Sequence, residues 1–227
     1  MKFNNAFSLA EVITTILIIG ATFAICMPVL NTGYQKNVTR TTLTDSIKNF
    51  NQVLFKYSQE KACNGNLACT DLFSGNNNQA GSKLSTVFNS SKSQDGNCWG
   101  SNISNPDTNL SAYSCVIDIK NVIFATQRLS NCSTDLRDTG NANTPTNHKL
   151  QKSCGYVYID TNGERGPNQF GKDVYIFVIT NSAPSYLYPV GGEFWKDTAN
   201  FNNIGTCPQD GRACAGNFVK DRGKINF

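Results

Sequence analysis

The sequence predicts an α+β fold, in which a long, kinked N-terminal helix packs on a small antiparallel β-sheet with disulfide-held loops. Three observations support this prediction. An apolar segment at residues 7–30 continues into a stretch with helical periodicity. Segments rich in β-branched and aromatic residues follow only after residue 114. Eight of the nine cysteines lie after the apolar segment, where disulfides would hold the polar part of the chain in place.

The apolar segment at residues 7–30 has the length of a transmembrane helix. Its 24 residues, at about 1.5 Å rise each, match a hydrocarbon layer of roughly 30 Å. No small-residue cleavage site follows the segment, so we expect the mature chain to retain it. Its single charge is Glu11, and a carboxylate in hydrocarbon costs about 3 kcal/mol unless it finds a partner or reaches water at the interface. Pro28 is expected to bend the helix.

Residues 31–61 are expected to continue this helix with one buried face. Their apolar positions are spaced four, three, four and three residues apart, at Leu43, Ile47, Phe50, Leu54 and Tyr57. The stripe is expected to lie on a globular domain. A coiled coil is the alternative, but about two heptads are too few to support it.

Residues 62–227 are expected to form that globular domain. Polar stretches at residues 62–109 and 130–152 are interpreted as irregular, the first being a long Asn/Ser-rich insertion. Strands are predicted at residues 115–119, 122–125, 155–159 and 174–179. Residues 185–189 are expected to add an edge strand, because Pro189 is tolerated there.

The cysteines are interpreted as disulfide-bonded. Their spacing is wide and the chain has one histidine, His148, so a zinc site is disfavoured and an oxidising compartment is indicated. Cys26 is expected to be a free, inert thiol. Pairing between neighbours closes the shortest loops and gives the bonds Cys63–Cys69, Cys98–Cys115, Cys132–Cys154 and Cys207–Cys214. The last is expected to enclose a small C-terminal loop.

The N-terminus resembles the type IV prepilins and pseudopilins. It has a short basic leader at residues 1–6, then Ala6 before Phe7-Ser8-Leu9-Ala10-Glu11 and an apolar helix. The resemblance implies cleavage between Ala6 and Phe7 by a prepilin peptidase, which also methylates the new amine; the family usually has Gly at the position of Ala6. It further implies that Glu11 pairs with the N-terminal amine of a neighbouring subunit, and that Pro28 is the helix-kinking proline found in many pilins.

The resemblance implies a structural subunit: a minor or major pilin or a pseudopilin of a type IV pilus, a type II secretion system or a DNA-uptake filament. Its partners would be other subunits through the N-terminal helix, the prepilin peptidase and an inner-membrane assembly platform. The chain would cross the inner membrane once, with its C-terminal domain in the periplasm, and reach the cell surface in the filament. The alternative is a binding or adhesin module at a filament tip.

Other function classes find less support. The net charge of +4 is scattered, so nucleic acid is not expected as a partner unless the filament takes up DNA. His148 lies in a polar stretch without a nucleophile–base constellation, and we expect no enzyme; an exported enzyme with an unfamiliar site is the weaker alternative.

One turn has the residue types of a calcium site. The stretch from Asp160 to Asp173 resembles a segment of some pseudopilins, and Asp160, Asn162 and Asp173 carry hard oxygen ligands. The pattern is not an EF-hand. The alternative is an Asn-Gly turn whose side chains bond the local backbone.

Overall fold

The computed structural model describes residues 9–75, 79–88, 90–95, 98, 114–165, 168–196, 207 and 211–221. Within its helices and strands, the side chains of residues 25, 28–32, 91, 94 and 95 lie outside the description. The chain divides into two compact units, Met1–Val38 and Thr39–Phe227. Each unit is considered by itself below.

The first unit contains the beginning of α1 (Leu9–Glu60). Its described side chains are exposed from Leu9 to Met27. No helix among the residues described with side chains combines the length and apolar character needed to cross a membrane. The leader, including Ala6 and Phe7, lies outside the described residues, as does the side chain of Pro28. The kink therefore stays a prediction.

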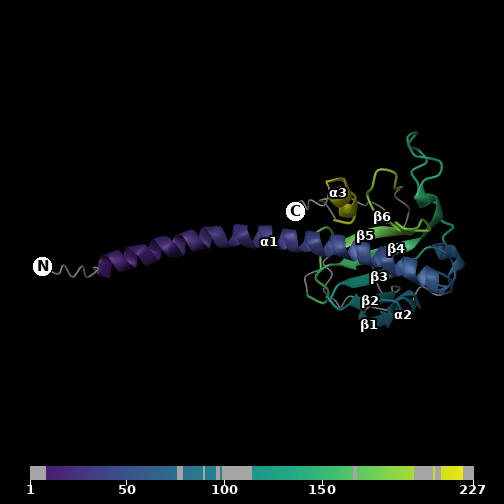
Figure 1. Cartoon of the computed structure of the whole chain (residues 1–227). Coiled ribbons are helices and arrows are strands. Elements are labelled where there is room, and N and C mark those ends of the chain that lie inside the picture. Colours follow the sequence, from purple (N-terminus) through teal and green to yellow (C-terminus); the bar gives the residue numbers. More distant parts are fainter. Residues whose placement is uncertain are drawn as a thin grey trace. The chain divides into compact units, whose positions relative to one another are not determined.

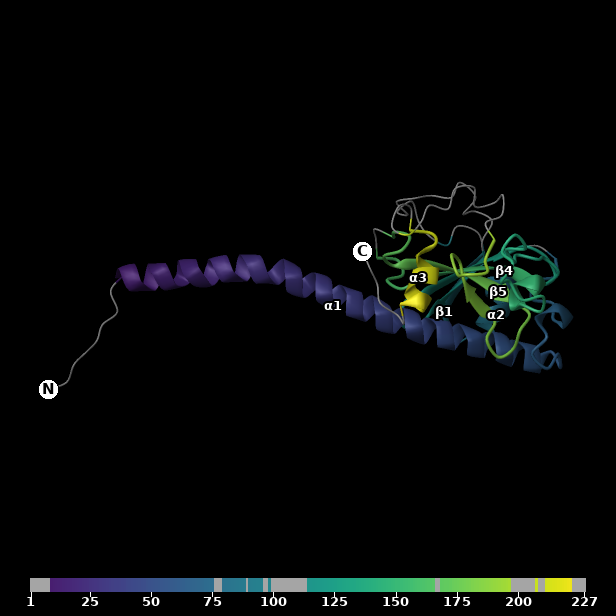
Figure 2. The same cartoon turned by 90° about the horizontal axis from the view of Figure 1, so that it is seen from above.

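The second unit is built on a six-stranded antiparallel sheet in which sequence order equals spatial order, from β1 at one edge to β6 at the other (Figure 1). The strands are β1 (Ser90–Asp95), β2 (Ser114–Asp118), β3 (Ile123–Arg128), β4 (Ser153–Asp160), β5 (Val174–Thr180) and β6 (Leu187–Pro189). Short helical segments accompany them: η1 (Leu67–Cys69), α2 (Ala80–Ser85), η4 (Lys149–Lys152) and α3 (Cys214–Lys220). Figure 2 gives a view of α3 from above.

The part of α1 that belongs to the second unit covers one face of the sheet. Leu43, Phe50 and Leu54 are fully buried in one cluster with the side chains of β3, β4 and β5. The Phe50 ring stacks on Phe124 of β3 at 5.2 Å between centroids. The predicted apolar stripe is thus confirmed for this part of the helix.

The other face of the sheet is also covered, by loops. A second cluster joins residues of β3, β4 and β5 to Leu136, Leu150 and Val190 from the connecting segments. Burial on both faces explains why all eight residues of β4 and all seven of β5 are buried. It also explains why residues 155–159 of β4 and 174–179 of β5 do not alternate between apolar and polar side chains.

The predicted sheet is confirmed in its central strands, and β6 lies at an edge as expected. The prediction of an irregular segment at residues 62–109 is wrong for α2 and β1. These elements give little periodic signal: α2 has six residues, and β1 reads Ser-Ser-Lys-Ser-Gln-Asp. Backbone pairing with β2, rather than apolar alternation, makes β1 a strand. In the polar stretch at 130–152, η4 is likewise regular.

The four predicted disulfides are present: Cys63–Cys69, Cys98–Cys115, Cys132–Cys154 and Cys207–Cys214. Cys26 is free and exposed. The last pair closes the expected short loop, and Cys214 is also the first residue of α3, whose residues Ala215 and Phe218 are buried in the core. The disulfide is therefore attached to a packed helix of seven residues, which was too short to show in the sequence pattern.

Candidate functional site

The beginning of α1 is an apolar surface that its own chain leaves exposed. Ile16, Leu17, Ile18 and Ile19 are consecutive and each is more than half exposed, at 63%, 65%, 64% and 54%. Successive helical residues point about 100° apart, so four in a row cover every side of the helix. A helix that is apolar all round is stable when surrounded by other apolar groups. We call Leu9–Met27 the apolar helix surface; its other large exposed members are Leu9, Val12, Ile13, Phe23 and Met27.

The threonines within the apolar helix surface have their hydroxyl groups satisfied by the helix itself. Thr14 Oγ1 donates to Ala10 O at 2.9 Å, and Thr15 Oγ1 donates to Val12 O at 2.9 Å. Thr22 Oγ1 donates to Ile19 O at 2.8 Å. Such bonds back to the preceding turn leave no hydroxyl group that needs water, so these polar residues are compatible with an apolar environment.

Glu11 is the charged residue of the apolar helix surface. It lies in the first turn of α1, where the helix dipole favours a negative charge. Ala6 and Phe7, the predicted processing positions, lie outside the described residues, so the structure does not bring them together with Glu11.

The predicted calcium residues form a hydrogen-bonded turn. Asp160 Oδ1 accepts hydrogen bonds from Asn162 N at 3.1 Å and Gly163 N at 3.0 Å. Asn162 Nδ2 donates to Asp173 Oδ2 at 2.8 Å, and Gln169 N donates to Asp173 Oδ1. A cation between these groups would require the Asn162 amide to turn its oxygen toward Asp173. In the part of the chain that the structure describes, no group of three or more His, Cys, Asp or Glu is placed to hold a metal.

Asp173 is nevertheless electrostatically unusual. Burial raises the pKa of its carboxyl group, and hydrogen bonds from Gln169 and Asn162 partly oppose this rise. The arrangement matches the Asn-Gly turn that was the alternative interpretation. Calcium binding stays a prediction.

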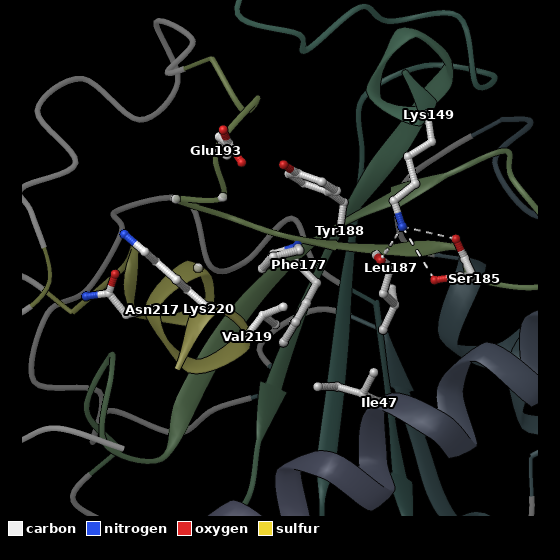
Figure 3. Close-up of a pocket in the computed structure, with 14 residues that line it drawn as sticks. Ile47, Lys149, Phe177, Ser185, Leu187, Tyr188, Glu193, Asn217, Val219 and Lys220 are labelled. Atoms are coloured by element: carbon white, nitrogen blue, oxygen red, sulfur yellow. Dashed lines mark hydrogen bonds between the residues drawn. The ribbon is translucent and has the colours of Figure 1, made fainter. Parts of the chain in front are cut away.

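A cavity of about 840 Å³ lies in the second unit, beside β6 (Figure 3). Its apolar surface comes from Phe177 on β5, Leu187 on β6, Ile47 on α1 and Val219 on α3. Its polar groups include Lys149, Ser185, Glu193, Asn217 and Lys220. The volume falls within the range of about 300–1,000 Å³ typical of small-molecule sites.

Lys149, at the start of η4, holds its ammonium group at the wall of this cavity. Nζ donates to Leu187 O at 2.9 Å and makes longer contacts of 3.3 and 3.4 Å to Ser185 O and Oγ (Figure 3). It also lies 5.5 Å from the centroid of the Tyr188 ring. Burial lowers the pKa of Lys149.

The β6 edge of the sheet is covered by the side chains of Asn51 on α1 and Lys149 on η4. The backbone N–H and C=O groups of Leu187 point away from β5, as the antiparallel register requires. Asn51 Oδ1 accepts from Leu187 N at 3.2 Å, and Lys149 Nζ donates to Leu187 O. Pro189 has no N–H, and its carbonyl accepts from Gly192 N at 3.1 Å. The outward backbone groups of β6 are thus used, which protects the edge from pairing with other strands.

Neither known families nor known structures identify the chain. No family model matches it, and comparisons with curated proteins and with solved structures give no match.

His148 was predicted to be a loop residue, and it precedes η4 as a partly buried N-cap. Its Nδ1 accepts from Leu150 N at 3.3 Å, and its ring lies edge-on to Tyr188 at 5.0 Å. Burial, followed by the charges of Lys149 and Arg137, lowers the pKa of His148. The contacts of His148 thus help to hold η4 and Tyr188, a residue of the cavity lining, in place.

Sequence reasoning missed the cavity, because its lining comes from α1, η4, β5, β6, α3 and the loops between them. The one available signal was the motif Leu187-Tyr188-Pro189, which is followed after Val190 by Gly191-Gly192. A proline in an edge strand followed by two glycines indicates a place where the backbone leaves the sheet and opens space.

Proposed function

We propose that the chain is a pilin-like structural subunit that inserts its N-terminal helix into the inner membrane and then into the core of a filament. The observation that supports this proposal most strongly is the apolar helix surface Leu9–Met27, whose described side chains are exposed in the isolated chain. A surface of this kind needs apolar surroundings from outside the chain. Lipid before assembly and neighbouring helices after assembly would supply them in turn.

The N-terminal residues support the same proposal. In a processed chain Phe7 would carry the free amine, and Glu11 would stand one helical turn away from it. The Glu11 carboxylate of one subunit would pair with the amine of the next subunit. In a low-dielectric bundle such a pair has a strong attraction, which offsets the cost of desolvating both charges only when the geometry is good. The pairing would therefore favour one register between subunits.

The second unit supports an exported location. Its four disulfides fit an oxidising compartment such as the periplasm. In the proposed arrangement this domain faces the periplasm before assembly and the outside of the filament afterwards. The domain would present its surface there, while the force for assembly would come from a separate motor in the cytoplasm.

The proposal is tested first at the N-terminus. Mass spectrometry of the native protein should show a chain that starts at Phe7 with a methylated amine. A native chain that still begins with Met1, or that starts far downstream of Phe7, would overturn the assignment.

Glu11→Ala tests the assembly step. We expect normal membrane residence and normal disulfides, but incorporation into filaments at about one tenth of the wild-type level or less, because each tenfold loss corresponds to about 1.4 kcal/mol of lost pairing. The matched control is Thr15→Ala, which removes a hydroxyl group already bonded within the helix and should assemble normally. Wild-type incorporation of Glu11→Ala would refute the pairing while leaving the N-terminal processing result intact.

A further inference from the structure

Among the described residues, no carboxylate forms an ion pair with Lys149 at the wall of the cavity beside β6. Glu193 also lines the cavity, but the Tyr188 ring lies between it and Lys149 in the view of Figure 3. Lys149 is partly buried, and an ammonium group in such a place that is bonded only to neutral oxygens keeps part of its desolvation cost. An anion in the cavity would reduce that cost.

Lys149 has hydrogen-bonding capacity left for such an anion. Its ammonium group has three protons. One is directed to Leu187 O at 2.9 Å, whereas the contacts to Ser185 O and Oγ, at 3.3 and 3.4 Å, go to two atoms of one residue. A single N–H shared between those two oxygens accounts for both long contacts. The third proton is then available to a ligand in the cavity.

The rest of the cavity wall is suited to an apolar body. Phe177 and Leu187 form a buried floor, since they are 1% and 5% exposed. Val219 on α3 stands at the rim and is 49% exposed. Figure 3 shows Lys149 and Val219 on different sides of the cavity, with Phe177 between them and with Lys220 and Asn217 beside Val219. The apolar surface of Phe177 and Leu187 therefore lies next to the Lys149 ammonium group, which suits a ligand with a charged group attached to an apolar body.

We propose that this cavity binds a small amphipathic carboxylate. Its carboxylate group accepts a hydrogen bond from Lys149 Nζ, and its apolar body lies on Phe177 and Leu187 beneath Val219. Burial lowers the pKa of Lys149, and a bound carboxylate would oppose this change by favouring the charged amine. The proposal does not depend on filament assembly, since all the residues involved belong to the second unit.

The test compares a carboxylate with its neutral isostere. The full chain in lipid nanodiscs is titrated with phenylpropionate and with phenylpropanamide, and ligand-observed NMR gives the dissociation constants against empty nanodiscs. We expect phenylpropionate to bind about tenfold more tightly, the size expected for a charge-assisted hydrogen bond. Lys149→Met should remove this difference, and Lys149→Arg should keep most of it. Equal affinity of the two ligands in the wild-type chain would overturn the proposal.

A second variant keeps the test decisive if Lys149→Met damages the edge of the sheet. Val219→Trp adds a large side chain at an exposed position of the rim, so it should weaken phenylpropionate binding about tenfold without unfolding the domain. The matched control is Ile119→Trp, at a position 66% exposed and outside the cavity lining, which should leave binding unchanged. Unchanged binding in Val219→Trp, or the absence of saturable binding in the wild-type chain, would refute the assignment of the site.

Discussion

The two parts of α1 have similar apolar side chains in opposite surroundings. In Leu9–Met27 the apolar residues occur on all sides of the helix, and Ile16 is 63% exposed. In the part that belongs to the second unit they recur every three or four residues, and Phe50 is fully buried. Periodicity, rather than apolar content, therefore separates a helix that packs within its own chain from one that needs an external partner.

Removing one large side chain from each part of α1 tests this difference with the largest expected effect. Phe50→Ala takes away a ring stacked on Phe124 and leaves a cavity in the core. We expect it to lower the free energy of unfolding by about 3–5 kcal/mol. Urea denaturation of the full chain in nanodiscs, followed by tryptophan fluorescence, measures the change, because both tryptophans lie in the second unit.

Ile16→Ala is the matched variant in the apolar helix surface. It should change the unfolding of the second unit by less than about 0.5 kcal/mol, since an exposed side chain has no packed neighbours in the chain to lose. Its effect should appear in filament yield instead. If Ile16→Ala destabilised the domain as much as Phe50→Ala, the distinction between the two parts of α1 would be wrong.

The features that sequence could predict are those with a local cause. The helical period of the apolar stripe from Leu43 to Tyr57 can be seen in the sequence. Strands β4 and β5 are rich in apolar residues because both faces of the sheet are covered. Neighbouring cysteines could be paired because short loops close at low entropic cost. In contrast, β1 is polar and depends on pairing with β2. Such pairing is a non-local contact that leaves no mark in the strand's own residues.

The candidate sites divide in the same way. The apolar helix surface is a continuous segment, so composition alone revealed it. The cavity beside β6 was missed because Ile47, Lys149 and Val219 are far apart in the sequence and meet only in the folded chain. For Asp160, Asn162 and Asp173 the residue types fitted two interpretations, and the hydrogen bonds of the structure match the turn.

Asn51 adds a second difference between the two parts of α1, because through it the buried part also stabilises the β6 edge of the sheet. Its Oδ1 accepts from Tyr186 N at 2.7 Å and from Leu187 N at 3.2 Å. Asn51→Ala leaves two backbone donors without this acceptor, and we expect a loss of about 1–3 kcal/mol in unfolding free energy. Urea denaturation measures it, and hydrogen exchange at Leu187 should become faster.

The control for Asn51→Ala is Asn49→Ala, two residues earlier in the same helix. The structure gives Asn49 a partly buried side chain, and among the described residues no hydrogen bond is formed by it. This variant should lie within about 0.5 kcal/mol of wild type. Equal losses in both variants would mean that Asn51 acts through helix packing, and the edge would then be held by Lys149 and Pro189.

The smallest effect concerns Asp71, a half-exposed carboxylate of the second unit. Tyr57, near the end of α1, donates from its hydroxyl group to Asp71 Oδ1 at 2.6 Å. This hydrogen bond, followed by the charges of Lys83 and Lys61, holds the pKa of Asp71 below its ordinary value. A carboxyl group with a lowered pKa in the folded state stabilises the fold above its unfolded pKa, and this contribution is lost as the pH falls through the folded value.

Asp71→Asn should therefore cost stability at neutral pH but not at the acid end. Because the Asp71 side chain is 48% exposed, solvent screening keeps the expected loss below about 1 kcal/mol at pH 7. The difference between wild type and variant should stay constant down to about pH 5 and shrink as the pH falls below the ordinary carboxyl pKa of about 3.9. Urea midpoints measured at a series of pH values provide the test. A difference that grew on acidification would mean that the folded state favours the protonated acid, which is the opposite of what the Tyr57 hydrogen bond requires.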